Sequence, residues 1–337
     1  MTSPAAGVHR DAFVMDGLVY HSDGDIAALK AGGINAVNLT VAHFEADFET
    51  ACRQMAVWHA RLAAPDAQWR LIETAGDFDA AKAAGQIGLV MGWQNARPLD
   101  EDLDRLSFFR RLGLRVVQLT YNYRNMLGDG CLEPEDGGLS ALGRAAVERL
   151  NRERIAIDLS HVGERTALQA VERSSRACFL THANAFAVTP LERNKSDDLI
   201  RAVAENGGVI GASIYGPMCW DGDLSRKPTL DDFLRHLDYL ANLAGPDHIG
   251  FGTDLAAGKD MARMAYDRET PRRWESIELY MKTFGRDIPA RYVEGFGGHQ
   301  TLGGITCALA DRGWDKAALK GFLGGNFKRA LGTVWGA

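Results

Sequence analysis

Short apolar runs rich in β-branched residues alternate with longer segments of helical period through most of the chain. Several of these runs are apolar on both faces, as strands of a parallel sheet must be when both sides are covered. Eight runs are predicted strands: Ala12–Tyr20, Asn35–Val41, Ile87–Trp93, Arg115–Tyr121, Ile155–Ser160, Ala177–Thr181, Gly208–Ile214 and Ile249–Asp254. Helical spacing of apolar residues predicts helices that include Asp100–Leu112, Ala141–Arg152 and Asp231–Ala244. The alternation predicts an α/β fold.

Eight strands alternating with helices suit either a closed barrel or an open doubly wound sheet, and the residues that end the strands separate the two. In a (β/α)8 barrel, residues from several strands converge at the carboxyl ends of the strands. Polar residues end strand after strand here, at Tyr121, Asn122, His161, His182 and Asp254. This pattern favours a (β/α)8 barrel of the TIM type. We expect one domain over residues 1–337, with an insertion or lid around residues 261–300.

The composition is that of an ordinary globular protein, and it excludes several classes of partner. Hydrophobic residues make up 46% of the 337 residues and charged residues 24%, which is enough apolar material for a large core. The formal net charge of −6, without a long Lys/Arg stripe, argues against a nucleic-acid partner. No apolar stretch approaches the ~18 residues of a membrane span, and no signal-peptide pattern is present. We therefore expect a cytoplasmic protein with no membrane partner.

The five cysteines are widely scattered and include no Cys-x-x-Cys pair. This spacing argues against a disulfide framework and against a thiolate zinc site. Cys131, in Gly128-Asp-Gly-Cys131, would be a soft metal ligand if it faced a metal site, whereas a buried inert thiol is the more ordinary role. The sequence leaves the role of Cys131 open.

Two histidines lie at the ends of neighbouring predicted strands, in Asp158-Leu-Ser-His161 and Thr181-His182. Neutral imidazoles at adjacent strand ends can point into one cavity and bind a borderline metal such as zinc. Asp254 ends the eighth strand, where its carboxylate is a candidate metal ligand or general base. The alternatives are a hydrogen-bonded structural role for each histidine and a helix N-cap role for Asp254. The three residues together predict a metal site at the carboxyl end of the barrel.

Arg193 follows His182 by about a dozen residues and precedes an Asp-rich helix start at 196–198. If its side chain points inward, the planar guanidinium suits a bidentate contact with the carboxylate of a substrate. The alternative is an ordinary surface arginine.

Six motifs between Leu119 and Leu331 occur together in a fixed order. They are LTYNYRN at Leu119–Asn125, DLSHV at Asp158–Val162, THAN at Thr181–Asn184, ERN-SDD at Glu192–Asp198, HIGFGTDL at His248–Leu255 and GGNFKRAL at Gly324–Leu331. In these motifs the chain resembles the membrane (renal-type) dipeptidases, peptidase family M19. The resemblance implies a (β/α)8 barrel of the amidohydrolase type and a two-zinc site that hydrolyses dipeptides. It also implies a homodimer.

Four site residues that the resemblance carries over are intact. His161 and His182 fall on the two histidine ligands of one zinc. Arg193 falls on the arginine that receives the carboxylate of the substrate. Asp254 falls on the aspartate that ends the eighth strand and is implicated in the metal site and in proton transfer.

The ligands of the family's other zinc are replaced. Where the family's first strand ends in Asp-Gly-His-x-Asp, this chain has Leu18 and Tyr20 in place of the histidine and the second aspartate. The bridging glutamate after the third strand is Gln94. One alternative source of ligands is His21-Ser-Asp23, three residues late. We therefore expect that the usual two-zinc site cannot form.

One divalent ion, with zinc as the expected metal, on His161, His182 and Asp254 is chemically sufficient for hydrolysis. The predicted reaction is cleavage of an amide-type C–N bond in a small carboxylate-bearing substrate, which is a dipeptide or an amino-acid derivative. Classical dipeptidase activity is a lesser expectation, because one of the two metal positions is lost.

The remaining polar residues at the strand ends take the other predicted roles. Tyr121, which replaces a substrate-contacting histidine of the family, or Gln94 would donate a hydrogen bond to the developing oxyanion. Arg193, with Tyr121 and Asn122, would bind the substrate. Two alternatives stay open: a lyase or decarboxylase on the same barrel, and a catalytically inactive binding homologue.

Overall fold

The computed structural model describes residues 4–221, 223, 226–258 and 292–336. The strands are β1 (Met15–Ser22), β2 (Ala36–Ala42), β3 (Trp69–Leu71), β4 (Ile87–Trp93), β5 (Leu114–Gln118), β6 (Ala156–Asp158), β7 (Cys178–Phe179), β8 (Ile210–Ala212), β9 (Ile249–Phe251) and β10 (Leu255–Ala257). The helices before the last strands are α1 (Pro4–Asp11), α2 (Ala27–Ala31), α3 (Phe48–Leu62), α4 (Ala75–Ala83), α5 (Arg105–Arg111), α6 (Ala141–Glu153), α7 (Glu164–Arg173), α8 (Asp197–Glu205) and α9 (Leu230–Ala244). After them come α12 (Leu302–Asp311), α13 (Lys316–Lys320) and α14 (Asn326–Trp335).

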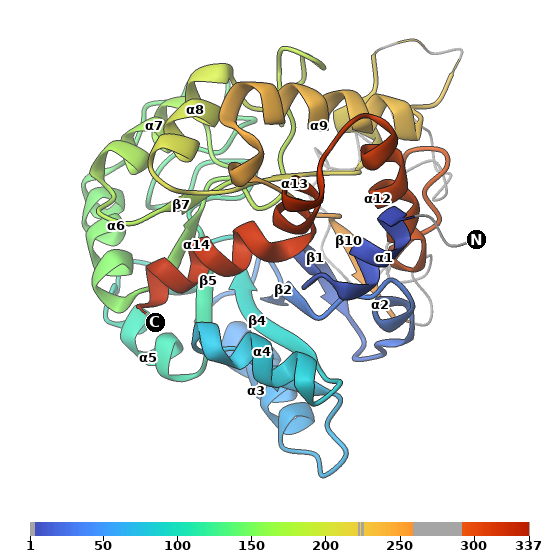
Figure 1. The fold of residues 1–337 in the computed structure, drawn as a ribbon. Coiled ribbons are helices and arrows are strands. Elements are labelled where there is room, and N and C mark those ends of the chain that lie inside the picture. The colour runs from blue at the N-terminus through green and yellow to red at the C-terminus, as the bar shows by residue number, and fades with distance from the viewer. Residues whose placement is uncertain (1–3, 222, 224–225, 259–291, 337) are drawn as a thin grey trace.

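The strands are parallel and follow one another in chain order, with the helices around them (Figure 1). β1, β2, β4, β5, β6 and β7 form one sheet, in which β3 adds to β4, and β8 pairs with β9. A parallel bridge between Leu180 and Ile210 joins β7 to β8. The last strands lie next to β1, since the Asp254 N–H donates to the Leu18 carbonyl (3.0 Å) and β10 pairs with β1. The predicted (β/α)8 barrel is confirmed.

All eight predicted strands are present, and α6 and α9 match two of the predicted helices to within a residue or two. The predicted helix Asp100–Leu112 is wrong in its first turn, since α5 begins only at Arg105. Asp100 has a φ of 51°, which is outside the right-handed helical region, and the Asp102 carboxylate accepts the Asp104 N–H (2.9 Å). Aspartates that bond to the backbone two residues on form turns that compete with a helix.

An apolar layer fills the amino-terminal end of the barrel. Its strand residues belong to one buried cluster with Phe327 of α14: Met15, Ala36, Val90, Val116, Ala156, Phe179 and Val209. In Figure 1, α14 lies across the strands, in front of them. A Cβ at Gly17 would lie 2.7 Å from the Phe327 ring, and one at Gly250 would lie 2.6 Å from it. The glycines therefore make room for the Phe327 ring, which closes this end.

Two residues further along each strand the interior is lined by polar side chains and glycines. Because strand side chains alternate between the two faces, these residues share the inward face with the apolar layer. They are Gly17, Asn38, Gly92, Gln118, Asp158, Thr181 and Gly211. The Asn38 amide donates to the Gly17 carbonyl (2.9 Å), and a Cβ at Gly92 would lie 2.2 Å from Asn38 Oδ1. This polar layer supports the strand ends, where the predicted site lies.

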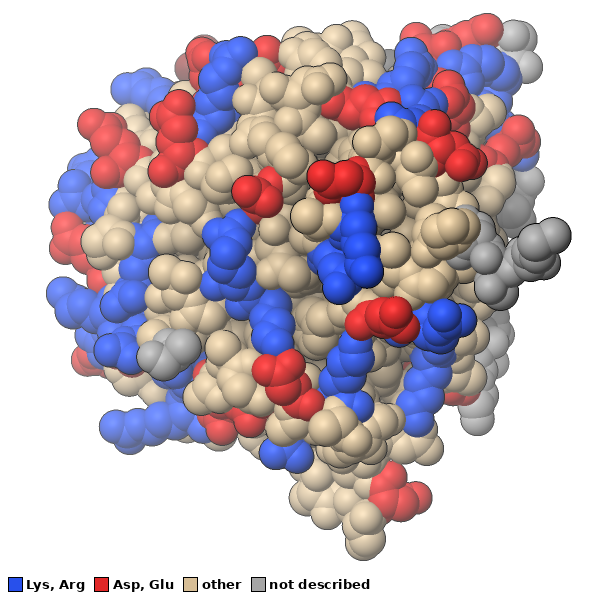
Figure 2. Space-filling view, in the orientation of Figure 1, with Lys and Arg blue, Asp and Glu red and all other residues tan. Residues whose placement is uncertain are grey.

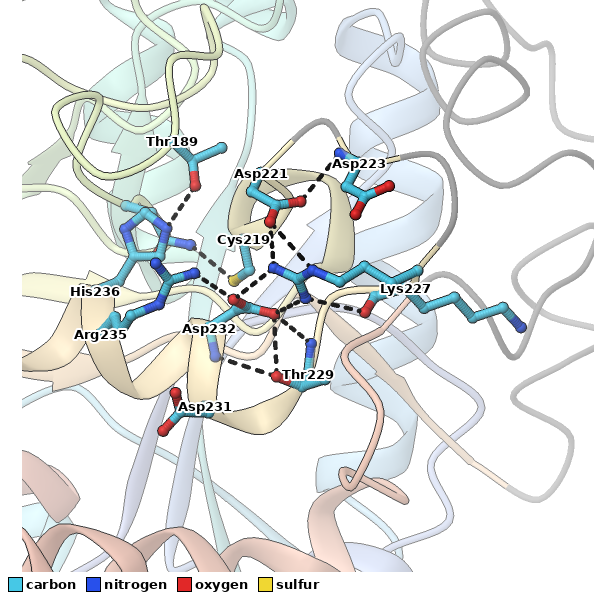
Figure 3. A network of polar contacts seen from close by, with 12 residues as sticks. Thr189, Cys219, Asp221, Asp223, Lys227, Thr229, Asp231, Asp232, Arg235 and His236 are labelled. Atoms are coloured by element: carbon cyan, nitrogen blue, oxygen red, sulfur yellow. Dashed lines mark hydrogen bonds and ion pairs between the residues drawn. The ribbon is translucent and has the colours of Figure 1, made fainter.

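A charged network anchors the start of α9 (Figure 3). The Asp232 carboxylate accepts hydrogen bonds from Arg226 (2.6 Å) and from the Thr229 N–H (2.8 Å), and Arg235 also donates to it. Arg226 pairs in turn with Asp221 (2.5 Å). Burial raises the pKa of Asp232, but the hydrogen bonds from Arg226, Thr229 and Arg235 outweigh burial. They hold this pKa well below its usual range. The network fixes the segment before α9 to the helix itself.

One turn further along α9, His236 is fully buried and neutral. Its Nε2–H donates to the Thr189 hydroxyl (3.1 Å), as Figure 3 shows, and its Nδ1 accepts the Ala185 N–H (3.3 Å). Burial, with a smaller effect from Arg235, lowers the pKa of His236 to about 3. Because Nδ1 accepts a hydrogen bond, protonation there would break the contact with Ala185.

Most of the predicted insertion around residues 261–300 lies outside the described residues, which resume at Tyr292. Tyr292 forms an antiparallel bridge with Tyr215, and Glu294 forms a parallel bridge with Thr229. The 3₁₀ turn His299–Thr301 then leads into α12, with His299 fully buried. The last residues of the predicted lid therefore pack into the barrel wall.

The described helices and the face shown in Figure 2 bear on the expected partners. None of the helices in the described ranges is long and apolar enough to cross a bilayer. On the face shown in Figure 2, basic and acidic side chains are interspersed. Such mixed charge differs from the continuous basic surface that binds a phosphate backbone.

We predict that Phe327→Ala lowers the free energy of unfolding by about 3–5 kcal/mol, because it removes the ring that fills the amino-terminal end. Urea denaturation followed by circular dichroism measures this change. Phe186→Ala is the matched control, since Phe186 is 46% exposed, and it should cost less than about 0.5 kcal/mol. Equal losses in the two variants would contradict the packing described for α14.

We predict that His236 makes stability fall in acid. Its pKa of about 3 in the folded protein lies below its ordinary value of 6.5, so the unfolded chain takes up the proton first as the pH falls. The contribution is present above pH 6.5 and is lost towards pH 3, at a slope of up to about 1.4 kcal/mol per pH unit. Urea denaturation of His236→Gln should give a shallower slope in this window, and identical slopes would refute the assignment.

Candidate metal site

Two buried imidazoles meet at the carboxyl end of the barrel. His161 follows β6 and His182 follows β7, and they are 5% and 0% exposed. Their Nε2 atoms lie 3.0 Å apart. Two nitrogens bound at about 2.0–2.1 Å to one tetrahedral zinc would be separated by about 3.3 Å. The two predicted histidine ligands are therefore brought together at nearly the spacing that one shared ion requires.

The buried carboxylate of Asp158 sets this arrangement. It accepts the Ser160 N–H (3.1 Å) and hydroxyl (2.6 Å) from its own strand. From the segment after β7 it accepts the Thr181 N–H (3.0 Å) and hydroxyl (2.8 Å). Burial raises the pKa of Asp158, which these hydrogen bonds oppose. Asp158 thus joins the two strand ends at the residues that immediately precede His161 and His182.

Hydrogen bonds at Nδ1 fix the tautomer of each imidazole. His161 Nδ1 lies 2.7 Å from Asn122 Oδ1, an acceptor, so Nδ1 carries the proton. The Thr181 hydroxyl donates its hydrogen to Asp158 and therefore accepts one from His182 Nδ1 (2.8 Å). Both Nε2 atoms consequently present lone pairs to each other. Such a pair of donors suits a cation between them.

Two buried cations add positive charge beside the histidines. Arg193 donates to the Ser160 and His182 carbonyls, the latter at 2.9 Å, and Lys195 donates to the Val162 carbonyl (2.6 Å). Burial, with smaller effects from Arg193 and Lys195, lowers the pKa of both imidazoles well below the ordinary value. Burial also lowers the pKa of Lys195 to about 8. The imidazoles are therefore neutral near pH 7, the form that binds a metal.

Gln94, at the end of β4, faces the histidine pair with its amide nitrogen. The Thr40 hydroxyl donates to Gln94 Oε1 (3.1 Å), which turns Nε2 towards His182 Nε2 (3.2 Å). An amide NH2 is a hydrogen-bond donor and has no lone pair for a metal. In this orientation Gln94 is suited to donate a hydrogen bond and unsuited to bridge two ions.

Tyr121 covers His161 through a stack of rings. Its ring centroid lies 4.1 Å from that of His161 and 4.0 Å from that of Phe44, with nearly parallel planes. Offset stacking of this kind contributes about 0.5–1.5 kcal/mol. Tyr121 and Asn122 thus both contact His161. Asn122 is buried and makes its contact at the ring nitrogen Nδ1.

Asp254, between β9 and β10, has a left-handed backbone with a φ of 54°. Its N–H donates to the Leu18 carbonyl (3.0 Å), and its carbonyl accepts the Tyr292 hydroxyl (3.1 Å). Within the described ranges, no group of three or more His, Cys, Asp or Glu residues is arranged to hold a metal ion. The structure therefore brings together two of the predicted ligands, and the role of Asp254 as the third stays a prediction.

Leu18 and the alternative ligands His21, Asp23 and Cys131 differ in their burial. Leu18 is 2% exposed and belongs to neither of the two hydrophobic clusters. His21 and Asp23 are both exposed, and Asp23 accepts the Asp25 N–H (2.8 Å) in a local turn. Cys131 is partly buried, and its sulfur lies 3.9 Å from Asn122 Oδ1. The number of metal ions that the site holds stays a prediction.

Several contributors to the site lie outside the sequence predictions. Asp158 and Thr181 belong to the motifs that contain the histidines. Pairing the two predicted strands that carry these motifs could have indicated that Asp158 and Thr181 lie close together. Lys195 and Phe44 had no local signal, since a lysine beside an Asp-rich helix start and an aromatic residue after a strand are both ordinary surface features.

The fold defines the class of protein, a (β/α)8 barrel with buried histidines at the carboxyl ends of its strands. The sequence profile of the membrane dipeptidases, peptidase family M19, matches residues 14–267. The chain therefore belongs to the membrane dipeptidase family.

Curated relatives bear out this membership. Dipeptidase aclJ of Aspergillus oryzae is 29% identical over 254 residues, which are 74% of this chain and 52% of the relative. An uncharacterized dipeptidase of Schizosaccharomyces pombe is 31% identical over 196 residues, which are 55% of this chain and 46% of the relative. The chain spans about half the length of these two relatives.

Solved structures match nearly the whole chain. An amidohydrolase from Pseudomonas aeruginosa has a TM-score of 0.84 at 27% identity, over 99% of each chain. A metallo peptidase from Rhodobacter sphaeroides, solved with a phosphinate mimic of the dipeptide L-Ala-D-Ala, has a TM-score of 0.77. Because it is only 21% identical, over 96% of this chain and all of the other, it supports the fold alone.

We predict that Asn122→Leu weakens zinc binding about 10- to 100-fold, because it removes the acceptor that fixes the His161 tautomer. Competition with a chromophoric chelator measures the affinity. Asn151→Leu is the control, since Asn151 of α6 is equally buried (7% exposed, against 8% for Asn122) and bonds to Ser174. The control should lose stability and keep its zinc affinity, and equal affinities in both variants would contradict the role of Asn122.

Proposed function

We propose that this protein is a mononuclear metallohydrolase that cleaves an amide-type C–N bond in a small carboxylate-bearing substrate, a dipeptide or an amino-acid derivative. The observation that carries the proposal is the convergence of the His161 and His182 Nε2 lone pairs at 3.0 Å. Membership in a family of dipeptidases supports hydrolysis as the reaction. Zinc is the expected metal, since two neutral imidazoles are donors that it favours.

The proposal of one ion follows from the residues at the second position. Leu18 offers only hydrocarbon, and Gln94 directs an amide NH2 at His182 where the family's bridging carboxylate would lie. A second dication there would lack the negative charge that offsets its loss of hydration. We therefore assign a single ion to His161 and His182, with Asp254 as the proposed third ligand.

The chain's own residues would divide the remaining work. An ion at this site would act as a Lewis acid and lower the pKa of water to about 7. Asp254 would take the proton of the attacking water and return it to the leaving nitrogen. The Gln94 amide, already turned towards His182, or the Tyr121 hydroxyl would donate to the oxygen that becomes negative.

Arg193 would hold the carboxylate of the substrate. A guanidinium has five N–H donors, and Arg193 uses two of its nitrogens on the Ser160 and His182 carbonyls. Its remaining N–H groups and its buried charge suit a carboxylate beside the histidine pair. Asn122 is held by His161, so we propose that its contribution to substrate binding is indirect.

We also predict a homodimer, one domain over residues 1–337 and a cytoplasmic location. A second reading, the non-catalytic binding homologue, would use the Gln94–His182 hydrogen bond (3.2 Å) to satisfy the histidine without a metal.

We predict one metal ion per chain in the wild-type protein and none in His161→Ala or His182→Ala, by elemental analysis of gently purified protein. The triple variant Leu18→His/Tyr20→Asp/Gln94→Glu restores the ligand types of the second position, so its count should rise to two. Hydrolysis of a dipeptide panel should rise with it.

Three results would contradict the proposal. A wild-type protein with no stoichiometric metal would favour the binding homologue. Two ions in the wild type would show that other residues supply the second ligand set. A wild type that holds one ion while both alanine variants also hold one would put the ion elsewhere.

A further inference from the structure

Next to Asp254, a buried cluster of Asp16, Thr253 and His299 joins three segments that lie far apart in the sequence. Asp16 of β1 and His299 of the turn before α12 are both 0% exposed, and Thr253 is 2% exposed. His299 Nε2 donates to Asp16 Oδ2 (3.0 Å), and the Thr253 hydroxyl donates to the same oxygen (2.5 Å). The cluster therefore links the first strand, the end of β9 and the C-terminal segment of the chain.

The Asp16 carboxylate also holds main-chain groups on both strands. Its Oδ1 accepts the Leu18 N–H (3.1 Å) and the Thr253 N–H (2.9 Å). The Leu18 carbonyl in turn accepts the Asp254 N–H (3.0 Å). Asp16 thus fixes both the residue that precedes Asp254 and the residue to which the Asp254 backbone is bonded.

This support matters because the Asp254 backbone is strained. A φ of 54° in a residue other than glycine costs about 1 kcal/mol or more, and such a conformation persists only when its surroundings determine it. The N–H and carbonyl of Asp254 are held by Leu18 and Tyr292, and its neighbour Thr253 is held by Asp16. The backbone in turn sets the direction of the Asp254 carboxylate.

His299 supplies one of the hydrogen bonds that satisfy the Asp16 carboxylate. A carboxylate buried without enough hydrogen-bond donors is costly, and Nε2–H of His299 is one of the four donors to Asp16. The backbone of His299 is itself held closely, since a Cβ at Gly32 would lie 2.1 Å from the His299 carbonyl. Among the described residues, His299 Nδ1 has no hydrogen-bond partner, so the ring is held to the cluster through Nε2 alone.

We propose that Asp16 and His299 are positioning residues for Asp254, and that the direction of its carboxylate depends on a histidine from the C-terminal segment. The proposal gives Asp16 a function in a first-strand motif whose two ligand positions are Leu18 and Tyr20 in this chain. It rests on the proposed function, because it takes Asp254 as a residue of the metal site.

Titration of the metal-free protein with Co²⁺ tests this, with the visible absorption spectrum reporting the ligand set. We expect Asp254→Asn and His299→Leu each to weaken Co²⁺ binding about 10- to 100-fold and to change the spectrum in the same way. The double variant should bind no more weakly than either single variant, because His299 acts through Asp254. His299→Gln, which keeps an N–H donor, should recover most of the affinity.

His9→Leu is the matched control. His9 also packs against Gly32, with Nε2 2.9 Å from the Gly32 carbonyl, and has its other ring nitrogen on Thr306 (2.7 Å). It should lower the melting temperature and leave Co²⁺ affinity unchanged. Thr253→Val removes only the hydroxyl bonded to Asp16 and should weaken Co²⁺ binding severalfold. This variant replaces His299→Leu in the test if His299→Leu does not fold.

The proposal is wrong if His299→Leu, or Thr253→Val in its place, melts earlier but binds Co²⁺ as the wild type does. It is equally wrong if Asp254→Asn has no effect, or if the double variant loses the product of the two single effects. Failure of the proposed function looks different, since His161→Ala would then bind Co²⁺ as tightly as the wild type.

Discussion

The hydrogen bonds of one buried carboxylate decide where the two histidines lie. Asp158 bonds to the backbone and hydroxyl groups of both Ser160 and Thr181, so the ends of β6 and β7 cannot move apart without leaving a buried charge unsatisfied. His161 and His182 are the next residues after Ser160 and Thr181, so the same hydrogen bonds place their imidazoles. Their Nδ1 bonds then turn both Nε2 lone pairs towards one point.

The balance of charge around that point differs from the family pattern. Two carboxylates of the family's motifs are replaced, by Tyr20 and Gln94, whereas the buried cations Arg193 and Lys195 are present. With a dication on the histidines, the positive charge of the ion would add to that of Arg193 and Lys195. An anionic substrate group beside Arg193 would offset this charge, which fits a carboxylate-bearing substrate.

The sequence predicted the barrel and the meeting of the histidines because both depend on short-range patterns. Each strand is a short apolar run, and each histidine directly follows one. The start of α5 was mispredicted because the turn formed by Asp100 and Asp102 overrides the helical spacing after it. The contact of His299 with Asp16 spans 283 residues and leaves no local pattern, so only the folded structure reveals it.

We propose that one metal ion lies between His161 and His182 and that no second ion lies beside it. Anomalous diffraction from crystals grown with zinc, recorded on both sides of the zinc absorption edge, tests this most directly. We expect one full-occupancy peak per chain, about 2.0–2.1 Å from both Nε2 atoms. Two peaks at the barrel end, or no peak between the histidines, would contradict it.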